Sequence, residues 1–131
     1  MLRVTSPLEP EVEDLVQRTI GSCIAVHREL GPGLLESIYG KAVCIELREA
    51  RIPFETEKSF PVHYRGGLLT TQRVDIVVDG AVLLEIKAVE RLAGIHRSQV
   101  LSYLRVSKLR VALLVNFNVP VLIEGLRRFV L

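Results

Sequence analysis

Cysteine is scarce in this 131-residue sequence, and its placement excludes the usual cysteine-based frameworks. Cys23 and Cys44 lie far apart within apolar helical patterns, without the spacing of metal ligands, so we expect two buried, reduced thiols. The three histidines are widely spread, and the sequence contains no H-x-E or C-x-x-C motif. A zinc site is therefore not predicted.

Aromatic residues and an excess of charge of either sign are also lacking. Aromatic residues make up only 5% of the chain, which argues against a stacking platform for single-stranded nucleic acid. The 17 basic and 15 acidic residues give a formal net charge of +2, which neither requires nor excludes a nucleic-acid partner. No run approaches the ~20 apolar residues of a membrane span, and the acidic, proline-broken start is unlike a secretion signal. We expect a cytoplasmic protein with no membrane partner.

Apolar residues, in contrast, are abundant. They make up 49% of the chain beside 24% charged residues, and the mean hydropathy is +0.33. This composition is typical of a globular chain. A length of 131 residues suffices for one real core but not comfortably for two. We therefore expect a single domain over residues 1–131.

Two helical patterns open the chain, separated by a glycine-proline break. From Pro10 to about Leu30, apolar residues recur at spacings of three and four, and Pro10 suits the first turn of a helix. The run Gly31-Pro32-Gly33 ends this helix. A second helical pattern extends over about residues 35–50.

Strand patterns dominate the rest of the chain. The expected strands cover residues 54–64, 70–78, 81–88 and 110–117, and a helix covers about residues 93–106. The inner side of that helix is expected to carry Ile95, Val100, Leu101 and Leu104. The tail favours a last edge strand that starts at Pro120 and has a bulge at Gly125. Helices covering a mixed sheet in the order α-α-β-β-β-α-β-β form an α/β (α+β) fold.

The predicted hairpin of the second and third strands contains Asp75, Glu85 and Lys87, although ionised groups among apolar residues are costly unless paired or metal-bound. Glu85 and Lys87 share a face because they are two residues apart in a strand. A two-residue turn would put Asp75 and Glu85 on opposite faces. A three-residue loop, Val78-Asp79-Gly80, would pair Asp75 with Leu83 and place Glu85 diagonally beside Asp75. We favour this longer loop.

Two carboxylates on one face suggest a bound cation. Crowded carboxylates raise the pKa of one of the two unless a cation lies between them. Oxygen ligands favour Mg²⁺ or Mn²⁺, and such an ion can polarise a phosphoryl oxygen and acidify a bound water. Lys87 could orient that water and offset charge on the phosphate. The alternative is a structural ion pair of Lys87 with Glu85 or Asp75 on a solvated face.

Several segments resemble the PD-(D/E)XK nuclease superfamily. Asp75, followed by Glu85-Ile86-Lys87 on a neighbouring strand, is similar to the motif that names it. Gly33-x-x-Glu36-x-x-Tyr39 is similar to the signature of its GxxExxY family, and "RVDIVVDG", "LLEIKAV", "HRSQVLSYL" and "LLVNF" resemble successive blocks of that family. The resemblance covers about residues 20 to 128, with departures at Ala112 and Asn118, where glycine is usual or frequent. It implies a restriction-endonuclease-like fold.

The resemblance also implies roles for single residues. The expected catalytic residues are Glu36, Asp75, Glu85, Lys87 and Gln99. The expected metal ligands are Asp75, Glu85, the backbone carbonyl of Ile86, and Glu36 directly or through water. On the sequence alone, Glu36 is equally well explained as an acid in the first turn of a helix.

Further candidates lie one helical turn from these residues. Gln99 and Tyr103 form a Q-x-x-x-Y pattern on one helix face, similar to exonuclease-type members of the superfamily. Tyr103 and Tyr39 are expected to support the site. For Tyr39 we favour ring packing with a hydroxyl hydrogen bond over direct support of Glu36. His96 and Arg97 are candidates for phosphate binding, and solvated side chains are the alternative.

Three functions follow from these observations. The first is a Mg²⁺- or Mn²⁺-dependent nuclease that hydrolyses phosphodiester bonds, with DNA as the expected nucleic acid. The second is a nucleic-acid-binding or protein-interaction module that keeps the fold and does not cleave. The third is a junction-resolving dimeric endonuclease. At this length, specificity would have to come from a homodimer or from a partner protein.

Overall fold

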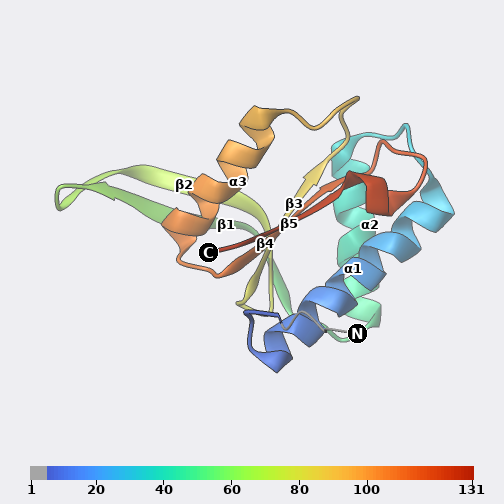
Figure 1. Cartoon of the computed structure of the whole chain (residues 1–131), viewed down its shortest axis with the longest axis horizontal. Coiled ribbons are helices and arrows are strands. Elements are labelled where there is room, and N and C mark those ends of the chain that lie inside the picture. The colour runs from blue at the N-terminus through green and yellow to red at the C-terminus, as the bar shows by residue number, and fades with distance from the viewer. Residues whose placement is uncertain (1–5) are drawn as a thin grey trace, which may run out of the picture.

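The computed structural model describes residues 6–131, and its elements follow the predicted order (Figure 1). The elements are α1 (Pro10–Leu30), α2 (Glu36–Glu49), β1 (Phe54–Tyr64), β2 (Gly67–Val78), β3 (Val82–Lys87), α3 (Gly94–Ser107), β4 (Val111–Asn116), the short 3-10 helix η1 (Leu122–Gly125) and β5 (Leu126–Val130). The predicted α+β class with the order α-α-β-β-β-α-β-β is confirmed.

One mixed sheet contains all five strands in the order β1-β2-β3-β4-β5. β3 and β4 run parallel, and the other neighbouring pairs are antiparallel. A parallel pair needs a crossover connection, and the segment that carries α3 supplies it. Both central strands read as apolar runs because helices cover them on both faces.

Helices lie on both faces of this sheet (Figure 1). α1 and α2 pack on one face, where alternate residues of β3 from Val82 to Ile86 are buried. α3 packs on the other face through Val100 and Leu104, which share a buried cluster with Leu83. Since side chains alternate along a strand, Glu85 projects with Leu83 toward α3. The sheet therefore places the two neighbouring residues Glu85 and Ile86 on opposite faces.

The helix α1 begins at Pro10, whose missing N–H costs nothing in a first turn. Its buried stripe includes Cys23 and His27, and His27 Nε2 lies 2.8 Å from the carbonyl oxygen of Val119. Cys23 and Cys44 are both buried and form no disulfide. Within residues 6–131, no helix combines the length and the apolar character that crossing a membrane requires.

The first turn of α3 is not buried against the sheet, although its apolar pattern begins there. Ile95 was expected on the inner side, but 63% of it is exposed. It lies in the first turn, before the helix reaches the sheet, and full burial begins at Val100. The expectation for Ile95 is therefore wrong.

The last strand exists but is shorter than expected. After Pro120 the chain forms η1, and β5 begins only at Leu126. Gly125 ends η1 and makes no bulge in a strand. A Cβ at Gly125 would overlap the backbone carbonyl of Asn116, so the close approach of η1 to the end of β4 requires glycine.

Candidate active site

Asp75 and Glu85 face each other across β2 and β3. The last backbone pairs are Val78 with Val82, Val77 with Leu83 and Ile76 with Leu84, so the register sets Asp75 opposite Glu85. The connecting loop has the predicted three residues, but they are Asp79, Gly80 and Ala81, and the first two have φ values of 47° and 66°. The expected pairing of Asp75 with Leu83 is wrong, because the loop begins one residue later. The expected proximity of the two acids is retained.

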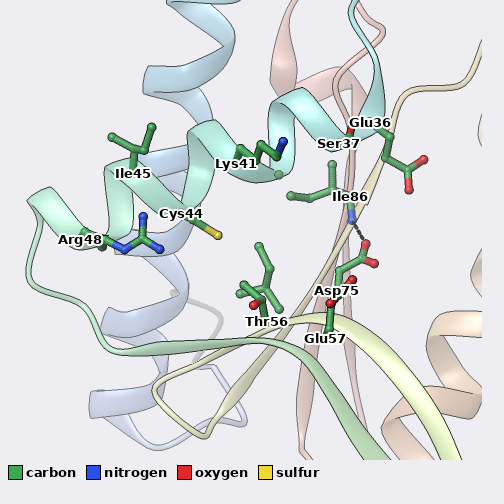
Figure 2. A pocket seen from close by; sticks show the side chains of 12 residues that line it. Glu36, Ser37, Lys41, Cys44, Ile45, Arg48, Thr56, Glu57, Asp75 and Ile86 are labelled. Carbon is green, nitrogen blue, oxygen red and sulfur yellow. Dashed lines mark hydrogen bonds between the residues drawn. The ribbon is translucent and has the colours of Figure 1, made fainter.

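Beyond the last backbone pair, the two carboxylates connect β2 and β3 through hydrogen bonds to backbone N–H groups. The Asp75 N–H donates to Glu85 Oε1 at 2.9 Å, and the Ile86 N–H donates to Asp75 Oδ2 at 3.0 Å. Figure 2 shows the Asp75 side chain directed at the Ile86 nitrogen. Each carboxylate thus orders the other strand with one oxygen. Within residues 6–131, no backbone N–H donates to its second oxygen.

Burial makes Glu85 the unusual group of the pair. Only 4% of Glu85 is exposed. Burial, and next the charge of Asp75, raise the pKa of Glu85 to about 8, while the nearby Lys87 ammonium acts in the opposite direction. Without a cation, Glu85 therefore holds a proton at neutral pH.

Lys87 stands at the end of β3 and is fixed through its backbone. The Phe117 N–H donates to the Lys87 carbonyl at 2.9 Å. Beside it, the buried Asn116 amide accepts from the Val89 N–H at 3.0 Å and donates to the Val89 carbonyl at 2.9 Å. The alternative of a structural ion pair gains no support, because the ion pairs in the described part of the chain are Lys58–Glu55 and Arg128–Glu13.

Glu36 is the first residue of α2 and lines the same groove as Asp75. Its side chain points toward the side of the groove where Asp75 lies (Figure 2). Within residues 6–131, however, no group of three or more His, Cys, Asp or Glu side chains is close enough to hold one ion. The structure therefore brings together Asp75, Glu85 and the Ile86 backbone, with Glu36 further along the groove.

Tyr39 holds the turn that precedes Glu36. Its hydroxyl donates to the Gly31 carbonyl at 2.5 Å and accepts from the Leu34 N–H at 3.1 Å. Its ring stacks on Phe117, with centroids 4.6 Å apart. Tyr39 thus combines ring packing with hydroxyl hydrogen bonds, and its contacts fix the glycine-rich turn at the start of α2.

The α3 candidates fall into two groups. Tyr103 is half-buried near the acidic pair, since burial first, and then Glu85 and Asp75, raise the pKa of its hydroxyl. Gln99, one turn earlier, is also half-buried. His96 Nδ1 instead accepts from the Ala93 N–H at 2.9 Å and caps the helix.

Arg97 lies on a different surface from Gln99 and Tyr103. Its guanidinium stands 5.8 Å from the centroid of the Phe129 ring. It also lines a depression with Arg127 and the start of α3. These contacts direct the Arg97 guanidinium toward Phe129 of β5.

Three residues in the groove were not found from the sequence. Glu57 lies opposite Asp75 on β1 with φ 52°, in the middle of a strand where positive φ is rare. Lys41 and Arg48 line the same groove from α2. A signal for the latter two existed, because their helical spacing places both on the stripe opposite the buried Val43 and Leu47. Nothing in the sequence marks Glu57.

Comparison with known proteins agrees with this geometry. The sequence model described as the PD-(D/E)XK nuclease superfamily matches residues 13–129. A search of curated proteins gave no match, and neither did a search of solved structures. The match spans most of the chain, and the protein belongs to the PD-(D/E)XK nuclease superfamily.

Proposed function

We propose that the protein is a metal-dependent nuclease that hydrolyses phosphodiester bonds of nucleic acid, with DNA as the expected substrate. Within the superfamily, we propose membership of the GxxExxY family, and the support for this is the Gly33-x-x-Glu36-x-x-Tyr39 motif. The observation that carries the proposal is the pair Asp75 and Glu85, held opposite each other with Lys87 one pleat further along β3.

The chemistry of the donors fits a hard divalent cation. In the described part of the chain, Asp75 and Glu85 each keep one carboxylate oxygen that accepts from no backbone N–H. The Ile86 carbonyl is the backbone oxygen between Glu85 and Lys87. Oxygen donors of this kind prefer Mg²⁺ or Mn²⁺. Such an ion would be held by Asp75, Glu85 and the Ile86 carbonyl, with Glu36 acting through a water. When bound, it supplies Lewis acidity for the phosphoryl oxygen and for a water.

The protein groups then divide the remaining work. Lys87 is fixed by the Phe117 hydrogen bond to its carbonyl and orients the attacking water. Its positive charge also offsets charge that develops on the phosphate. Gln99 and Tyr103 approach from α3, on the side to which Glu85 projects, and orient water or a phosphate oxygen.

The pair is costly for a protein that only binds. Two carboxylates beside each other, one of them buried, destabilise the fold unless a ligand compensates. A binding module would gain from replacing either acid by a neutral residue. This cost favours a cleaving enzyme over the non-cleaving module.

Nicking of supercoiled plasmid tests the proposal. Wild type should nick with Mg²⁺ or Mn²⁺ and not in chelator, and Asp75→Asn or Lys87→Ala should lower the rate by about 10²-fold or more. Asp79→Asn and Lys58→Ala are matched controls, because Asn tolerates positive φ and an exposed ion pair contributes little. Both controls should cleave like wild type. Absence of cleavage of every DNA and RNA tested, in a folded protein, would reject the enzyme in favour of the binding module.

A further inference from the structure

A groove of about 550 Å³ runs from Asp75 along α2 (Figure 2). One wall is the outer stripe of α2, which contributes Ser37, Lys41 and Arg48, and the other wall comes from β1 and β2. The groove thus reaches Asp75 of the acidic pair and extends away from it. The residues that would bind the metal and orient the water do not include those that line this extension.

Charge changes sign along the groove. Figure 2 shows Glu36, Glu57 and Asp75 at one end of the groove and Arg48 at the other, with Lys41 between them on α2. Neither cation has an ion-pair partner in the part of the chain that the structure describes. The two cations are seven residues apart on one helix stripe, which corresponds to roughly 10 Å along the axis. An anion that repeats along a chain would meet both.

Arg48 is held in place facing the groove. Its guanidinium lies 5.2 Å from the centroid of the Phe54 ring, a cation–π contact at the start of β1. Arg48 also lies close to the Cys44 thiol. Burial raises the pKa of this thiol, and the positive charge of Arg48 acts in the opposite direction. The Phe54 contact therefore orders Arg48 next to the groove, and no carboxylate in the described part of the chain pairs with its charge.

Between the charges, the groove wall is aliphatic. Ile45, Ile76 and Ile86 line it, and Ile45 is 55% exposed. A volume of this size is that of a small-molecule site and is far too small for a duplex. The outside of a duplex also presents phosphates, which would leave the aliphatic wall uncovered. Among the described residues no aromatic side chain lines the groove, so a strand would be held there through its phosphates and the aliphatic wall and not by stacking of its bases.

We infer that the groove binds one unpaired nucleotide strand beside the scissile phosphate, with its backbone phosphates on Lys41 and Arg48. The substrate is then a nucleic acid with a single-stranded end or flap. The inference rests on the proposed function for the position of the scissile phosphate. Binding by Lys41 and Arg48 can be measured without cleavage.

Fluorescence anisotropy in chelator measures that binding. A labelled single-stranded oligonucleotide and its blunt duplex are titrated with wild type, Lys41→Gln and Arg48→Gln. Each variant should bind the single strand about 5- to 10-fold more weakly, and each should reduce the salt slope by about 0.7. Affinity for the duplex should hardly change. Arg105→Gln, an exposed cation on α3, is the control and should behave as wild type.

A third variant guards against trivial loss of fold. Ile45→Glu adds a negative charge to the groove at an exposed position and should weaken single-strand binding without lowering the melting temperature. Unchanged single-strand binding in all three variants would overturn the inference, and so would an equal loss for duplex. If wild type cleaves and the variants bind the single strand as wild type does, the proposed nuclease function is supported and the proposed role of the groove is rejected. If the variants bind the single strand more weakly and wild type cleaves no nucleic acid, the proposed role of the groove is supported and the proposed nuclease function is rejected.

Discussion

Asp75 and Glu85 hold β2 and β3 together with their carboxylates at the point where backbone pairing between the two strands stops. The same carboxylates that would meet a cation therefore also carry part of the fold. Substitutions at these positions must be read for stability as well as for activity.

Asp75→Ala should destabilise the protein more than Asp75→Asn. Alanine leaves the Ile86 N–H without its acceptor, which costs about 1–3 kcal/mol for a buried donor. Asparagine keeps a carbonyl oxygen that can accept the same bond. Urea unfolding should therefore give a clearly lower midpoint for alanine than for asparagine. Equal midpoints would show that the 3.0 Å hydrogen bond does not contribute.

Stability without metal should fall as the pH rises from about 4.5 to about 8. The pKa of Glu85 rises from 4.5 to about 8 on folding, so the folded state binds the proton more tightly over that window. The stabilisation is complete below pH 4.5 and is lost as the pH rises through the folded pKa. We expect a loss on the order of 1–3 kcal/mol, less than the full shift implies, because Asp75 and Glu85 titrate as an interacting pair.

Glu85→Gln supplies the comparison for this pH dependence. The variant should remove the slope in urea unfolding measured across this window, whereas Glu90→Gln at an exposed position should not. Saturating Mg²⁺ should also reduce the slope for wild type, since a cation stabilises the ionised carboxylate. A wild-type slope equal to that of Glu85→Gln would contradict the assigned shift.

Tyr39→Phe should loosen the turn before Glu36. The hydroxyl bonds to the Gly31 carbonyl and the Leu34 N–H would be lost while the ring remains stacked on Phe117. We expect about 1–2 kcal/mol lower stability and a reduced nicking rate. Tyr64→Phe, at an exposed ring, should change neither. Full stability of Tyr39→Phe would assign the order of the turn to the glycines and the proline alone.

Gly125→Ala and Gly21→Ala should act in opposite directions. A methyl group at Gly125 meets the Asn116 backbone, which cannot move without disturbing β4, so a loss of several kcal/mol or failure to fold is expected. Gly21 lies inside α1 with open space around it, and alanine there should stabilise by about 0.5–1 kcal/mol. Thermal unfolding of both variants gives the answer. A tolerated Gly125→Ala would refute the close approach of η1 to β4.

The order of the elements could be predicted from the periodicity of the apolar residues and from the glycine and proline residues between them. Each apolar pattern was long enough to specify a helix or a strand. Details that depend on tertiary contact were less accessible. The predicted hairpin loop begins one residue too early, which moves the expected partner of Asp75 by two residues, from Glu85 to Leu83. The chain allows either placement of a three-residue loop, and the structure has positive φ at Asp79 and Gly80. Ile95 matches the apolar period but lies beyond the edge of the sheet.

Motif residues of the site were predictable, and the groove was not. Asp75, Glu85 and Lys87 stand out as charges in apolar strands, a local signal. The helical period indicates that Lys41 and Arg48 share one stripe of α2. That this stripe and Glu57 line the same groove depends on how α2 packs against β1 and β2, which no short stretch of sequence encodes.

The bond from the Phe117 N–H to the Lys87 carbonyl has a consequence for the order of synthesis. Every acid of the site, and the lysine, leaves the ribosome before β4 exists. A chain terminated before residue 111 would carry all these charged side chains but lack the parallel neighbour of β3. Prematurely released fragments should therefore lack the proposed nuclease activity, which would begin only after β4 has been translated.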